Sequence, residues 1–205
     1  MAQFLNDRDQ ERQRSFAHDL FSAIEDCNGP AVLRAASKIS DLDAHSNERD
    51  ETPLIFACRH DLRPKEIAYL LSRSNALRQN TEGFTALIFA AWGRLSHSSD
   101  LVSLLLPASN PLALTARNNS ALHYAIASAH SPSVELLLPV SDLTRLDRSG
   151  RAPIAQAKAL MDIESRDSIV GLILAETARR EALLIAAGIF IPTRTPSADR
   201  PLLRL

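Results

Sequence analysis

The chain has few of the residues that covalent or metal frameworks need. Among its 205 residues there are two cysteines, Cys27 and Cys58, which are too few for a disulfide framework. Their apolar neighbours predict that both are small core residues in a reducing compartment. The sequence has no pair of cysteines at CxxC spacing and no pair of histidines at HxxxH spacing, whereas a zinc site needs about four ligands. We therefore predict no metal site and a cytoplasmic location.

Glycine, charge excess and long apolar runs are also scarce. Six glycines leave no glycine-rich loop for a phosphate, so no cofactor is expected. With a net charge of −1, the chain has no excess of positive charge to attract nucleic acid or an anionic membrane. The longest apolar run, residues 182–191, is about half of the length that a membrane span requires. Residues 1–9 become charged after two apolar side chains, which does not fit a secretory signal.

A repeated segment is present instead. Its copies begin at Thr52, Thr85, Ser120 and, more faintly, Ala152, which are 33, 35 and 32 residues apart. An independent marker at the ends of apolar helical runs has nearly the same spacing of 34, 35 and 32 residues, with a serine in each copy: Ser40, Ser74, Ser109 and Ser141. A period in this range is typical of stacked repeat proteins.

Each unit is predicted to contain a turn, a short alanine-containing helix, a loop and a leucine-rich helix. Thr52 and Thr85 are expected to cap the first helices with their hydroxyl groups. In the fifth unit the second helix is predicted from about Ser168. The units are assigned to residues 15–46, 47–79, 80–114, 115–146 and 147–187, of which the first and last are degenerate caps. A charged lead-in (residues 1–14) precedes them, and a flexible proline-rich tail (residues 188–205) follows.

Two segments carry a family resemblance. Residues 80–87 read Asn-Thr-Glu-Gly-Phe-Thr-Ala-Leu, and residues 120–125 read Ser-Ala-Leu-His-Tyr-Ala. With their spacing, they resemble ankyrin repeats over about residues 15–187. The resemblance implies an all-α solenoid of about five helix-turn-helix repeats, and it gives His123 a hydrogen-bonding role across the turn. Asp50 and Asn118 replace the usual turn glycine, and both residue types tolerate left-handed backbone.

The resemblance also implies a site, a concave surface of turn tips and first helices that binds a partner protein. Carried over position by position, the partner-binding residues are Glu48, Arg49, Glu51, Arg59, His60, Thr81, Glu82, Phe84, Trp92, Arg117, Asn119, Arg148 and Arg151. Trp92, the only tryptophan, is either an interface hot spot or a core residue covering the next repeat. Phe84 is expected at a solvated tip, with contact to the neighbouring turn as the alternative.

We compare three possible functions of the predicted fold. The first is a monomeric, non-enzymatic interaction module, and the second is a bacterial effector or toxin-neutralising protein that uses the same face. The third is an enzyme with a site at His97, whose neighbours in residues 96–100 offer hydroxyl and carboxylate groups. A helix-capping loop explains those neighbours better, so the sequence predicts no catalytic residue.

Overall fold

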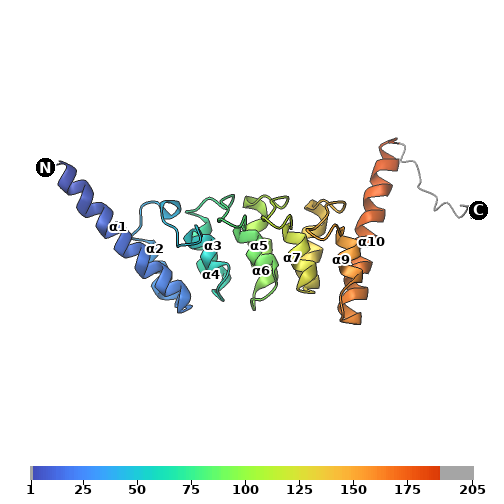
Figure 1. Cartoon of the computed structure of the whole chain (residues 1–205), viewed down its shortest axis with the longest axis horizontal. Helices are drawn as coiled ribbons and strands as arrows, with labels where there is room; N and C mark the ends of the chain where they lie inside the picture. The colour runs from blue at the N-terminus through green and yellow to red at the C-terminus, as the bar shows by residue number, and fades with distance from the viewer. Residues whose placement is uncertain (1, 190–205) are drawn as a thin grey trace, which may run out of the picture.

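The computed structural model describes residues 2–189, with side chains from residue 9 onward. These residues form ten α-helices and three short 3-10 helices, without a strand in the described part of the chain. The helices stack side by side into an elongated body, with α1 and α10 at opposite ends and the turns gathered along one edge (Figure 1). The predicted all-α architecture is confirmed.

The helices form five successive pairs. They are α1 (Ala2–Glu25) with α2 (Gly29–Ala36), α3 (Pro53–Ala57) with α4 (Pro64–Leu71), α5 (Ala86–Ala91) with α6 (Ser98–Leu105), α7 (Ala121–Ala127) with α8 (Ser131–Leu137), and α9 (Pro153–Lys158) with α10 (Ile163–Ala186). Single 3-10 turns follow three of the second helices, at Leu42–Ala44 (η1), Leu106–Ala108 (η2) and Leu138–Val140 (η3). First helices contact the first helices of neighbouring pairs, and second helices contact second helices. One continuous apolar core therefore runs through the stack.

Polar caps begin the first helices at the repeated sequence. The Thr52 hydroxyl accepts a hydrogen bond from the Ile55 amide at 3.4 Å, and the Thr85 hydroxyl accepts one from Ile88 at 3.2 Å. In α7 the His123 ring bonds the Ser120 hydroxyl at 2.8 Å and the Arg145 carbonyl at 3.1 Å. The predicted caps and the predicted role of His123 are confirmed. Burial lowers the pKa of His123, which favours the neutral ring.

The turns repeat a local geometry that their sequence permits. Asp50 and Asn118 have positive φ angles of 57° and 60°, as do Gly83 and Gly150 at the equivalent positions. Asp and Asn adopt this left-handed conformation at lower cost than other side chains, so both turns form without glycine, as predicted.

An Asn or Asp side chain anchors three of these four turns. The Oδ1 atom of Asn80 accepts from the amides of Glu82 and Phe84 at 3.0 and 2.8 Å. Asn47 and Asp147 accept two backbone amides in the same pattern. Such bonds satisfy backbone donors that the turn cannot pair otherwise. The anchors lie five residues before the helix caps, a regularity that the sequence-based predictions did not include.

Two local expectations are wrong. Cys27 is exposed, because it lies in the turn between α1 and α2 with a left-handed φ of 49°; only Cys58 is buried, and burial raises the pKa of its thiol to about 12. The helix α10 begins at Ile163 rather than at about Ser168, because the Asp162 carboxylate caps it by accepting the Ser165 amide at 2.8 Å.

The helix α1 covers both the charged lead-in and the first expected helix. The division of the chain into units and tails stays a prediction.

Arginines close the carbonyl ends of two second helices. Arg73 donates to the carbonyls of Ala36, the last residue of α2, and of Ile39 shortly after it. Arg180 of α10 donates to the carbonyls of Leu138 and Ser141 after α8. Helix ends leave carbonyl groups without partners, so each arginine ties one pair to another.

The Glu176 carboxylate should make folding sensitive to acid. Hydrogen bonds from Arg179 and Arg180 hold its pKa at about 2, below the ordinary 4.5. The unfolded chain therefore binds more protons between these values, and the free energy of unfolding falls as the pH is lowered from about 4.5 towards about 2. We expect Glu176→Gln to weaken this pH dependence in urea unfolding. Glu181→Gln, an exposed change on the same helix, is the control, and equal profiles for both variants would contradict the assignment.

Candidate interaction groove

The turns of neighbouring repeats are joined to one another. The amide and hydroxyl of Thr81 donate to the Arg49 carbonyl at 3.2 and 3.1 Å. The Ala116 amide donates to the Glu82 carbonyl at 2.8 Å. Side chains on three successive turns are thereby fixed relative to one another.

Four aromatic rings from two repeats form a cluster beneath these turns. The Phe84 ring stacks on Phe89 with centroids 4.7 Å apart and lies 5.2 Å from Tyr124. The Trp92 ring lies 5.4 Å from Tyr124 and 6.1 Å from Phe84. Aromatic pairs at such separations attract beyond the effect of their buried area. The cluster therefore holds α5, α7 and the turn before α5 together.

The sequence of α5 explains why Trp92 stands at the edge of this cluster. All six residues of α5 are buried, and Trp92 is its C-cap residue, partly exposed. Gly93 follows with a φ of 68°, and a Cβ atom there would lie 2.8 Å from Ser128 and His130 side-chain atoms. The chain can therefore turn away directly after Trp92, which remains partly exposed.

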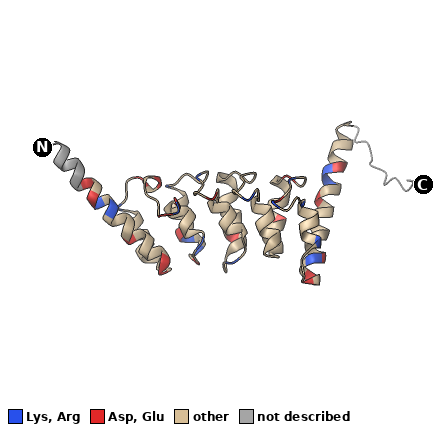
Figure 2. Ribbon diagram, in the orientation of Figure 1, with Lys and Arg blue, Asp and Glu red and all other residues tan. Residues whose placement is uncertain are grey.

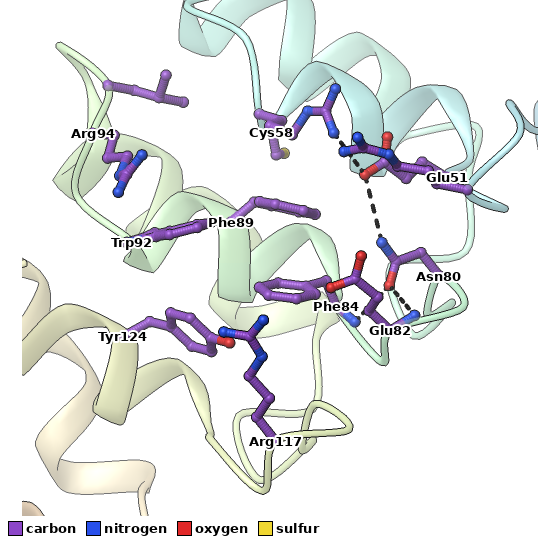
Figure 3. A pocket seen from close by; sticks show the side chains of 13 residues that line it. Glu51, Cys58, Asn80, Glu82, Phe84, Phe89, Trp92, Arg94, Arg117 and Tyr124 are labelled. Carbon is purple, nitrogen blue, oxygen red and sulfur yellow. Dashed lines mark hydrogen bonds and ion pairs between the residues drawn. The ribbon is translucent and has the colours of Figure 1, made fainter. Parts of the chain in front are cut away.

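The rings line a pocket of about 420 Å³, which we call the aromatic groove. It lies between α3, α5 and α7, and Figure 3 shows the rings side by side across its floor. Besides the four aromatic residues it is lined by Cys58, Asn80, Leu95, two glutamates (Glu51 and Glu82) and four arginines (Arg49, Arg59, Arg94 and Arg117). The Arg94 guanidinium lies 4.3 Å from the Trp92 ring centroid, within the range of a cation–π contact.

One comparison with known proteins agrees with the repeat architecture. Residues 20–113 match the family model for ankyrin repeats, in three copies. This part of the chain consists of ankyrin repeats. No curated protein matches the sequence. In the structure, the ankyrin geometry continues beyond residue 113 through the pairs α7–α8 and α9–α10. Ankyrin repeats indicate a protein–protein interaction module, which is the function that the sequence predicts in general terms.

The aromatic groove gathers seven of the thirteen residues that the ankyrin resemblance selected. These seven are Arg49, Glu51, Arg59, Glu82, Phe84, Trp92 and Arg117. The other six do not line it. His60 packs against Phe56 with ring centroids 4.4 Å apart, Arg151 pairs with Asp147 at 3.0 Å, and the remainder lie on turns outside the groove: Glu48, Thr81, Asn119 and Arg148.

Two of the gathered residues are buried, although the sequence predicted solvated turn tips at both positions. Phe84 is only 7% exposed, because its ring packs into the cluster with Phe89 and Tyr124, a contact with the following repeat that corresponds to the alternative for this residue. Glu51 is 1% exposed, because its carboxylate turns inward and bonds Arg59 at 3.2 Å and Asn47 at 2.8 Å. A buried carboxylate needs such partners to offset its loss of hydration.

Sequence reasoning missed Tyr124 and Arg94. A signal for Tyr124 was present, because Phe56, Phe89 and Tyr124 are 33 and 35 residues apart and so occupy one position in successive ankyrin repeats. No comparable signal marks Arg94, since the equivalent residues are Asp61 and Ala129.

The remaining chemical hypotheses find little support in the described residues. His97 and Asp100 lie 3.8 Å apart and are well exposed, while the Ser98 hydroxyl bonds the backbone of Leu95, so a hydroxyl–imidazole–carboxylate chain does not form there. Among these same residues, no group of three or more His, Cys, Asp or Glu side chains is placed to hold a metal ion. None of the helices in residues 2–189 combines the length and apolarity needed to cross a membrane.

Proposed function

We propose that this ankyrin protein binds a partner protein, without catalysis, in the aromatic groove. The observation that supports the proposal most is the meeting of Trp92, Tyr124 and several arginines from three repeats at one partly open pocket. Tryptophan, tyrosine and arginine are the residues most enriched among interface hot spots. A volume of about 420 Å³ also lies in the range of sites that enclose a few side chains of a ligand.

The joined turns support the same proposal. Because Arg49 and Glu82 lie on turns tied by backbone hydrogen bonds, the rim of the groove is preorganised, and less entropy is lost when a partner binds. A bacterial effector or toxin-neutralising protein would use the same face. Its delivery to another cell, the cytoplasmic location and the monomeric state stay predictions from the sequence.

A charge reversal at the rim tests the binding face. Arg117 lines the groove, whereas Arg148 lies on a turn outside it, and both side chains are exposed. We expect Arg117→Glu to abolish the capture of at least one protein from a native extract, while Arg148→Glu retains it. Exposed substitutions of this kind change stability by about 0.5 kcal/mol or less, which circular dichroism melting checks. If both variants captured the same proteins as the unmodified chain, the aromatic groove would not be the binding face.

A further inference from the structure

The aromatic groove has an unbalanced set of charges. Four arginines and two glutamates line it, although the whole chain has a net charge of −1, and residues of both signs occur along the stack (Figure 2). One glutamate is already engaged, because Glu51 is buried and pairs with Arg59. Glu82 is then the single carboxylate facing three other arginines, which are Arg49, Arg94 and Arg117. Within the described residues, these three guanidinium groups form no ion pair.

The arginines flank the aromatic floor on different sides. In Figure 3, Arg94 lies beside Trp92, and Arg117 extends toward Phe84 and Tyr124 from the opposite turn. When a guanidinium packs its face on a ring, the N–H groups at its edge stay available to an acceptor, and their geometry matches a carboxylate. The groove therefore offers an apolar, aromatic surface between anion-binding groups.

We propose that the occupant is an extended segment of a partner protein in which an aspartate or glutamate lies next to an aromatic or aliphatic side chain. This inference rests on the proposed function of the groove. The apolar side chain would lie against Trp92 and Tyr124, and Arg94 and Arg117 would both attract the carboxylate. Complementary charge favours such a segment over a neutral one and speeds its association.

The same charges argue against two other occupants. A lysine, or a methylated lysine of the kind that aromatic cages recognise, would meet the repulsion of the surrounding arginines. Residues 190–205 of this chain contain three arginines and one aspartate, so they carry the wrong sign of charge as well. Single-stranded nucleic acid also combines negative charge with stacking bases, and it is therefore included in the test.

A display library of random 12-residue peptides identifies the preferred chemistry directly. We expect selection on the full chain to enrich peptides with an acidic residue beside an apolar one. Binding of synthetic copies without tryptophan can be followed by the fluorescence of Trp92, the only tryptophan. Replacing the acidic residue by its amide should weaken binding about tenfold or more. Raising the NaCl concentration from about 0.05 to about 0.5 M should also weaken it, because salt screens exposed charges.

Matched variants separate the possible outcomes. We expect Arg94→Gln and Arg117→Gln to weaken the selected peptides about tenfold, while Arg148→Gln leaves them unchanged. Peptides that bind all three variants equally would show that the binding face itself is assigned wrongly. If the selected peptides were neutral or basic and their binding depended on Arg94 and Arg117, the groove would still be the binding face. The proposal of an acidic occupant would then be wrong. Tighter binding of a single-stranded 12-nucleotide DNA than of the selected peptides would overturn it too.

Discussion

Leu87→Ala is expected to lower the free energy of unfolding by about 2–5 kcal/mol, the usual cost of a cavity left by a deleted leucine. Leu87 is fully buried in α5, and α5 contacts α3, α6 and α7. Few neighbours can move to fill the cavity, because each of these helices is held by its own repeat and by the next. Urea unfolding followed by circular dichroism gives the measurement.

Leu77→Ala makes the same chemical change at a side chain that is 57% exposed, and it should alter stability by about 0.5 kcal/mol or less. The difference between the two leucines isolates the contribution of burial. Equal unfolding midpoints would mean that the assigned core is wrong. Because a repeat stack gains its stability from contacts between neighbours, a broader transition in Leu87→Ala would indicate that the two halves of the stack unfold separately.

Gly83→Ala should be about as damaging, for a different reason. Gly83 has a φ of 81°, and a Cβ atom there would lie 2.9 Å from both the Leu114 carbonyl oxygen and the Thr115 Cα. Left-handed backbone costs an alanine about 1–2 kcal/mol, and forcing an extra carbon into a close contact costs about 1–3 kcal/mol more. Since the contacted atoms are backbone, the next turn has to move. We expect a total loss of about 2–5 kcal/mol in urea unfolding.

Two other glycines separate these contributions. Gly150 has a φ of 72°, but a Cβ atom there would meet nothing within 4 Å, so Gly150→Ala should show only the backbone cost of about 1–2 kcal/mol. Gly171 lies in α10 with open space around it and an ordinary φ, and Gly171→Ala should stabilise the chain by about 0.5–1 kcal/mol. Equal losses for Gly83→Ala and Gly150→Ala would show that the contact with the next turn costs nothing.

The Gly83 turn also connects stability to the proposed binding function. It lies between Glu82 and Phe84, which both line the aromatic groove. A shift of this turn would change the packing of Phe84 on Phe89 and Tyr124. A folded Gly83→Ala variant should therefore also show an altered fluorescence of Trp92.

Local features of the repeats could be predicted from the sequence, because they depend on residues a few positions apart. The hydroxyls of Thr52 and Thr85 cap helices through the amide three residues later, and Asp50 and Asn118 adopt left-handed backbone by their own conformational preference. The spacing of these signals was sufficient to predict the repeat period and hence an all-helical stack.

The aromatic groove was predicted only in part. The resemblance placed Arg49, Trp92 and Arg117 on one face, and the structure brings all three to one pocket. It placed Phe84 and Glu51 in solvent, although both are buried. Phe84 points into space that the neighbouring repeat leaves, and that space is not encoded within one repeat. Glu51 instead turns toward Arg59 and Asn47 of its own repeat, a side-chain pairing that the family pattern does not specify.

The amino-acid sequence by itself therefore determined the period, the helix caps and the turn conformations of this protein, because each arises from contacts within a single repeat. Only the tertiary structure decided that Phe84 joins Tyr124 across two repeats, that Glu51 is neutralised by Arg59, and that Arg94 lies over Trp92. The stacking of one repeat on the next sets the distance between Phe84 and Tyr124. The other two contacts join residues of one repeat, eight and two positions apart, and they depend on side-chain conformations that the repeat motif does not specify.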